Sequence, residues 1–194
     1  MLAGIGAVID RKGADMEEVK RINRELIYKG TIIDYYKDTM AIPNGNVVKW
    51  DHIEHKGAAA VIPVLEDGRI VLVRQLRNSV EKYTWEIPAG GLNGREEPTA
   101  VAARRELEEE TGFTTDEELK LLITIHTTVA FCNEKIDIYV AHGLKEGLQH
   151  LDEDEFLDVK AFTVEEIKER IYSGQMTDAK TIAAIMSYCD KYLA

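Results

Sequence analysis

The sequence contains few cysteines and no long apolar run. Its 194 residues include two cysteines, Cys132 and Cys189, whose wide separation argues against a disulfide framework. No apolar stretch reaches the roughly 18 residues that a transmembrane helix requires. The apolar segment at residues 1–9 lacks the basic start and the cleavage site typical of a signal peptide. We therefore expect a cytoplasmic protein that has no membrane partner.

Positive charge is also scarce. The 24 lysine and arginine residues are outnumbered by 35 aspartate and glutamate residues, which gives a formal net charge of −11. This charge repels polyanions and argues against nucleic acid as a partner. A small phosphate ester could still bind where metal ions neutralise its charge. With 45% hydrophobic residues, the chain can form one proper core and a small additional subdomain.

Three glutamates form the most informative pattern in the chain. Glu106, Glu109 and Glu110 are spaced i, i+3, i+4, so on a helix their carboxylates share one face. They repel one another there, and a hard divalent cation such as Mg²⁺ would turn that repulsion into attraction. Pro98 suits the first helical position and Gly112 the position just after the last turn, which predicts a helix over 98–111. The alternative is a solvated acidic helix face.

The residues around these glutamates resemble the Nudix box. Its pattern is G-x5-E-x7-R-E-U-x-E-E-x-G-U, in which U is a bulky apolar residue, and residues 91–113 match it at every fixed position. The resemblance implies the Nudix fold, an α+β domain with a mixed β-sheet between helices. It assigns metal binding to the carboxylates of Glu106, Glu109 and Glu110 and to the backbone carbonyl of Ala89. The implied metal is Mg²⁺, with Mn²⁺ as an alternative.

Other residues of the box are expected to support this site. An arginine among carboxylates can fix their orientation through bidentate hydrogen bonds. The residues to which we assign such structural roles are Gly91, Glu97, Arg105 and Gly112.

Segments outside the box are similar to the ADP-ribose pyrophosphatase group of Nudix hydrolases. The similar segments are 43–45, 55–63, 74–77, 86–90 and 174–179. The similarity implies hydrolysis of the diphosphate bond of ADP-ribose to AMP and ribose 5-phosphate. It also implies a homodimer, in which residues 1–55 form an extension with a small antiparallel dimerisation sheet and residues 56–194 form the Nudix hydrolase domain.

The substrate has alternatives. Many members of the group have Ser-Pro-Gly shortly after the box, where this chain has Thr127-Thr-Val-Ala130. Another nucleoside diphosphate sugar, such as GDP-mannose or ADP-glucose, therefore stays open. A Nudix sensor that binds ADP-ribose without hydrolysing it is a further alternative, although sensors typically lose box acids that this chain keeps.

The resemblance also suggests residues for substrate binding and proton transfer. Arg77 is a candidate phosphate clamp, Glu86 a candidate contact for the ribose or a metal-bound water, and Glu134 a further acidic position. In relatives a loop glutamate is the general base. The register here favours Glu155, with Glu153 second, and Glu109 and Glu134 are the next candidates.

Local patterns predict most of the secondary structure. Strands are expected at 31–36, 47–53, 58–64, 70–73, 119–124 and 135–141, with a hairpin turn at 66–69. A capping box at Thr163 starts a helix that ends near Gly174, and a last helix covers 178–193. The charged stretch 15–26 is compatible with a helix.

Overall fold

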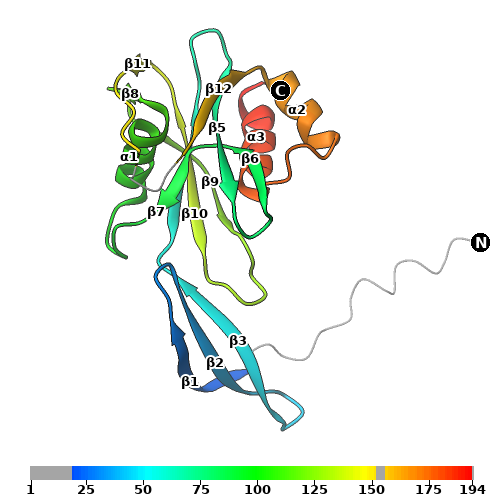
Figure 1. Cartoon of the computed structure of the whole chain (residues 1–194). Helices are drawn as coiled ribbons and strands as arrows, with labels where there is room; N and C mark the ends of the chain where they lie inside the picture. Colours follow the sequence, from blue (N-terminus) through cyan, green and yellow to red (C-terminus); the bar gives the residue numbers. More distant parts are fainter. Residues whose placement is uncertain (1–18, 152–155, 194) are drawn as a thin grey trace, which may run out of the picture. The chain divides into compact units, whose positions relative to one another are not determined.

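The computed structural model describes residues 19–151 and 156–193 (Figure 1). The chain forms two compact units. The first comprises the described part of Met1–His55 together with Ala130–Cys132, and the second comprises Lys56–Val129 together with the described part of Asn133–Ala194. No helix among the described residues is long and apolar enough to cross a membrane.

From residue 19 onward, the first unit contains a three-stranded antiparallel sheet in the order β1-β2-β3. Its strands are β1 (Lys20–Lys29), β2 (Ile33–Ala41) and β3 (Val47–His55). The helix expected at 15–26 is wrong from residue 20 onward, and residues 15–18 lie outside the described part. Charged residues suit this strand because they pair across it: Arg24 lies opposite Asp38 and donates two hydrogen bonds of 2.7 Å to its buried carboxylate. Cross-strand pairing has therefore overridden local helix propensity.

Within its described residues, the second unit contains three sheets and three helices. Its strands are β4 (Ala58–Pro63), β5 (Ile70–Arg77), β6 (Lys82–Glu86), β7 (Ala89–Gly91), β8 (Phe113–Thr115), β9 (Lys120–His126), β10 (Lys135–Ala141), β11 (Leu144–Glu146) and β12 (Asp158–Phe162). Its helices are α1 (Thr99–Thr111), α2 (Val164–Tyr172) and α3 (Ala179–Tyr192). The strand orders are β7-β4-β10-β9, β12-β5-β6 and β11-β8.

The central sheet lies between helices. Strand β4 pairs in parallel with β10 and antiparallel with β7, so this sheet is mixed. Residues of β4 alternate between two cores: Ala60 packs in one cluster with Ile185 of α3, and Val61 packs in another with Leu107 of α1. Figure 1 shows α1 on one side of these strands and α3 on the other. The predicted α+β architecture, a mixed sheet between helices together with a small N-terminal antiparallel sheet, is confirmed.

Most of the predicted helix ends agree with the structure. Pro98 is the N-cap of α1 rather than its first residue, and Gly112 ends the helix in the left-handed conformation at φ 73°. Thr163 forms the predicted capping box of α2 with Glu166. Asp178 caps α3 by accepting a hydrogen bond from the backbone N–H of Thr181. Helix termini of this kind are fixed by short-range chemistry, which the sequence displays directly.

Candidate active site

The acidic face of α1 packs against strand β7. Glu106 and Glu110 are buried and Glu109 is partly exposed. One Glu110 carboxylate oxygen accepts a hydrogen bond from the backbone N–H of Ala89 at 3.0 Å. Glu106 lies so close to Gly90 that a Cβ there would be 2.1 Å from its Oε1 atom. The structure thus brings two predicted ligand carboxylates against the backbone that includes Ala89.

Arg105 lies among the carboxylates, as the sequence predicts. Its Nη1 donates to Glu106 at 2.6 Å and to Glu109 at 2.8 Å, and its Nη2 donates to the carbonyl of Gly91 at 3.0 Å. Its Nε lies 3.6 Å from Glu97. Burial lowers the pKa of Arg105, but the adjacent carboxylates outweigh burial and raise it overall. Arg105 therefore joins the loop after β7 to the acidic face of α1.

The carboxylates of this face fit a divalent cation in their chemistry. In their present side-chain conformations, no three or more His, Cys, Asp or Glu residues within the described ranges are arranged to hold a metal ion. The reason is visible in their partners, since Glu106 and Glu109 are turned to Arg105 and Glu110 to the N–H of Ala89. The donor set nevertheless consists of oxygens, which Mg²⁺ requires. The missing Cβ of Gly90 leaves the space that the Glu106 carboxylate occupies.

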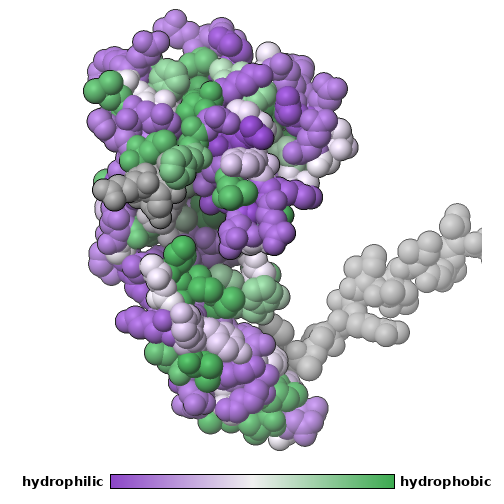
Figure 2. Space-filling view, viewed as in Figure 1, coloured by the Kyte–Doolittle hydropathy of each residue, from purple (hydrophilic) through white to green (hydrophobic). Residues whose placement is uncertain are grey.

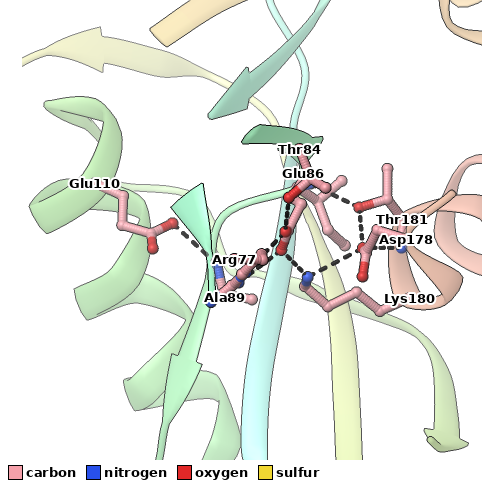
Figure 3. A network of polar contacts seen from close by, with 9 residues as sticks. Arg77, Thr84, Glu86, Ala89, Glu110, Asp178, Lys180 and Thr181 are labelled. Carbon is pink, nitrogen blue, oxygen red and sulfur yellow. Dashed lines mark hydrogen bonds and ion pairs between the residues drawn. The ribbon is translucent and has the colours of Figure 1, made fainter. Parts of the chain in front are cut away.

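A second polar cluster surrounds Glu86 (Figure 3). Arg77 donates from Nε and Nη2 to its two carboxylate oxygens, at 2.8 and 2.6 Å. Thr84 and Lys180 donate to it as well. Burial raises the pKa of Glu86, but the hydrogen bond from Arg77 and the charge of Lys180 outweigh burial and hold this pKa at about 2. Glu86 is therefore ionised, and its partners come from the protein.

Lys180 is a member of this cluster that sequence reasoning missed. It is buried in the first turn of α3, and its Nζ also donates to Asp178 at 3.0 Å. A lysine at this position opposes the helix dipole, which favours negative charge at an N-terminus. That local mismatch was the one available signal, because the partner carboxylate of Glu86 lies 94 residues away in sequence.

Arg77 lies between the two clusters. The hydrogen bond to Glu86 raises its pKa most, and the charges of Glu110 and Asp178 raise it further. Its side chain is 39% exposed, whereas that of Glu86 is 2% exposed. Figure 3 shows Arg77 joined to Glu86, and Glu110 joined to the backbone of Ala89 in the same view. The partly exposed Arg77 guanidinium is therefore a candidate contact for an anionic ligand, and it experiences the charge of Glu110 on the acidic face.

Three candidates remain, namely Glu134, Glu153 and Glu155. Glu134 accepts a hydrogen bond from the hydroxyl of Thr127 at 2.6 Å, next to β10. Glu153 and Glu155 lie outside the described residues. The segment before them is attached to the end of α1, because Gln149 donates to the carbonyl of Glu110 at 2.6 Å and the backbone N–H of His150 donates to that of Glu109 at 3.1 Å.

Comparison with known proteins decides the family. The sequence profile of the NUDIX domain matches residues 54–185, about two thirds of the chain. This chain belongs to the Nudix family. The geometry just described therefore belongs to a Nudix box, as its sequence pattern predicted.

Several relatives resemble this Nudix protein along most of their length. It is 39% identical over 170 residues to an ADP-ribose pyrophosphatase of Bacillus subtilis (strain 168), covering 87% of this chain and 91% of the relative. It is 41% identical over 170 residues to a methanol dehydrogenase activator of Bacillus methanolicus, with the same coverage. An ADP-ribose pyrophosphatase of Mycobacterium tuberculosis is 28% identical over 172 residues, covering 88% of this chain and 83% of the relative.

A solved structure supports the fold. The crystal structure of an ADP compounds hydrolase superposes with a TM-score of 0.80 at 20% sequence identity, covering 92% of this chain and 96% of the other. At this identity the likeness concerns the fold alone.

Proposed function

We propose that this Nudix protein hydrolyses the diphosphate bond of ADP-ribose to AMP and ribose 5-phosphate, with Mg²⁺ as its metal and Mn²⁺ as a substitute. The observation that carries the proposal is the acidic face of α1, where Glu106 and Glu109 bind Arg105 and Glu110 binds the backbone of β7. The length-wide similarity to ADP-ribose pyrophosphatases supports the choice of substrate.

The chemistry requires charge neutralisation. A diphosphate repels an attacking hydroxide, and bound divalent ions would neutralise it and acidify the attacking water. Glu106, Glu109, Glu110 and the Ala89 carbonyl would hold these ions. Arg105 keeps the carboxylates beside β7, while Arg77 binds a phosphate oxygen through its guanidinium. Glu155 accepts the proton of the attacking water, with Glu153 as the second candidate.

Two other functions have specific support. Residues 127–130 lack the Ser-Pro-Gly found in many ADP-ribose pyrophosphatases, which keeps GDP-mannose and ADP-glucose open as substrates. The second candidate is regulatory, because one similar protein is named for activating methanol dehydrogenase. The intact box acids favour catalysis over ligand sensing as the primary activity.

We also propose a homodimer formed through residues 1–55. The three-stranded sheet of the first unit exposes apolar side chains, some of them in view in Figure 2. They are Ile22, Leu26, Ile27, Tyr28, Ile32, Ile33, Val47 and Trp50. Such a surface is typical of a sheet that is covered by a partner, because exposed apolar area favours association.

A hydrolysis screen tests the proposed activity. ADP-ribose, GDP-mannose and ADP-glucose are incubated with the protein and Mg²⁺ or Mn²⁺, and the products are identified. We expect AMP and ribose 5-phosphate from ADP-ribose at the highest kcat/KM.

Glu110→Gln should lower turnover by orders of magnitude, because a metal supplies several kcal/mol to the transition state. Glu108→Gln, exposed on the same helix, is the matched control. An active, folded Glu110→Gln protein would refute the metal assignment.

A further inference from the structure

The carboxylate of Glu86 has no acceptor position left for a substrate. Its Oε1 accepts from Nε of Arg77 and from the hydroxyl of Thr84, and its Oε2 accepts from Nη2 of Arg77 and from Lys180. An ionised carboxylate offers about four lone-pair sites in total. Because the side chain is also buried, it acts on a ligand through the residues that it holds. One of these is Arg77, the longest donor that is not buried, with a side chain 39% exposed.

The two bonds from Arg77 fix the plane of its guanidinium. They use Nε and Nη2, so the Nη1 amino group is the part that would bind a phosphate oxygen. A guanidinium held by a bidentate bond is oriented before the ligand arrives, and less freedom is lost on binding. Orientation alone is insufficient, however, because the paired carboxylate also cancels the positive charge that a diphosphate would meet.

Lys180 supplies the charge that corrects this cancellation. It is buried between Glu86 and Asp178 and donates to both. With Lys180 present, the cations Arg77 and Lys180 balance the anions Glu86 and Asp178. Without it, the same group would carry one net negative charge next to the acidic face of α1, and it would repel a diphosphate.

We propose that Lys180 is a positioning residue of this enzyme. It binds the Glu86 carboxylate, so that Arg77 stays oriented and its positive charge still attracts the substrate diphosphate. This inference rests on the proposed function. It gives the start of α3 a part in the reaction, although no atom of α3 needs to touch the substrate.

A double-mutant cycle separates positioning from mere stability. We expect Lys180→Met to raise KM for ADP-ribose about tenfold, the effect of one charge-assisted hydrogen bond, with kcat within about twofold of wild type. In an Arg77→Met background the same change should alter KM by less than about twofold, because the residue on which it acts is gone. An equal factor in both backgrounds, or an unchanged KM, would overturn the proposal.

Matched variants complete the cycle. Lys191→Met makes the same substitution in the last turn of α3, about 16 Å along the helix, and should leave KM unchanged. Lys180→Arg retains the charge and should restore most of the wild-type KM. If Lys180→Met does not fold, Lys180→Gln removes the charge but keeps a donor, and it is carried through the same cycle.

A measurement without substrate distinguishes failure of this inference from failure of the proposed function. The Nε–H resonance of Arg77 is followed by NMR in the free protein. It should shift in Lys180→Met or Lys180→Gln and stay in place in Lys191→Met. An unshifted resonance would exclude the link from Lys180 to Arg77, whatever the protein hydrolyses.

Discussion

Gly90 contributes to the site by having no side chain. The space that a Cβ would fill is occupied by the carboxylate of Glu106, whereas a Cβ at the neighbouring Gly91 would meet nothing within 4 Å. The clash at Gly90 involves the far end of a flexible side chain, so the backbone need not move. The two glycines therefore differ in their expected effect on the metal site, although they are adjacent in the chain.

Gly90→Ala should strongly reduce hydrolytic activity without unfolding the protein. We expect kcat/KM to fall about 100-fold or more, because Glu106 is pushed out of the place where it would bind metal. Gly91→Ala should stay within a few-fold of wild type, since the Gly91 carbonyl that binds Arg105 is kept. Activity assays with a metal titration, together with thermal melting, check both. Equal activity of the two variants would contradict the placement of Glu106.

The ionisation of Glu86 makes a prediction about stability at low pH. Its folded pKa of about 2 lies below the ordinary value of 4.5. A lowered pKa contributes stability above the unfolded value, and this contribution is lost as the pH falls from about 4.5 toward 2. The melting temperature of wild type should exceed that of Glu86→Gln clearly at pH 6, and the difference should shrink by pH 3. A difference that is constant over this range would show that Glu86 is not ionised.

The general base is tested by a pair of isosteric changes. Glu155→Gln should lower kcat by about 10²- to 10⁴-fold with little change in substrate binding, because the amide cannot accept the proton. Glu153→Gln should remain within a few-fold of wild type. The reverse pattern in steady-state kinetics would transfer the role to Glu153, and two active variants would transfer it to Glu109 or Glu134.

Among the helices, α2 depends most visibly on its cap. Thr163 accepts from the backbone N–H of Glu166, and the Glu166 side chain accepts from the backbone N–H of Thr163. Thr163→Ala should destabilise the protein by about 1 kcal/mol and lower the melting temperature by about 2–4 °C. Thr163→Ser keeps the hydroxyl and should melt close to wild type. Identical melting of the two variants would mean that the cap contributes nothing.

Elements defined by neighbouring residues were predictable from sequence, and those defined by distant partners were not. The ends of α1, α2 and α3 follow from caps within a few residues. By contrast, β1 is a strand because Arg24 pairs with Asp38 on the next strand, which no helix propensity reveals. Strand β12 was missed in the same way, since its partner β5 lies 84 residues away at the pair Asp158 and Arg74.

The same contrast holds for the site. The box placed Glu106, Glu109, Glu110 and Arg105 together because they lie on one helix. In the register of β5 with β6, Arg77 pairs with Lys82 and Glu86 with Val73. The contact between the long side chains of Arg77 and Glu86 on one face of this hairpin could have been predicted only if β6 had been recognised. Lys180 required knowledge of how α3 packs, which depends on a core assembled from the whole domain.

For the whole molecule, we expect a dimer in solution. Light scattering should give twice the chain mass of 21.9 kDa. Ile22→Glu places a charge on the exposed apolar surface of β1 and should shift the mass toward that of one chain. Leu148→Glu, at an exposed position in the second unit, should leave the dimer intact. A monomeric wild type with full activity would exclude the proposed assembly.

The separation of Glu86 and Lys180 along the sequence also has a consequence for synthesis on the ribosome. The two residues are 94 positions apart, and chains grow at about 5–20 residues per second, so Lys180 is added roughly 5–20 s after Glu86. During that interval the β5–β6 hairpin carries a carboxylate whose second cation does not yet exist. Chains that stall before α3 should therefore lack one partner of Glu86, and the β5–β6 hairpin should be less stable in them than in the complete domain.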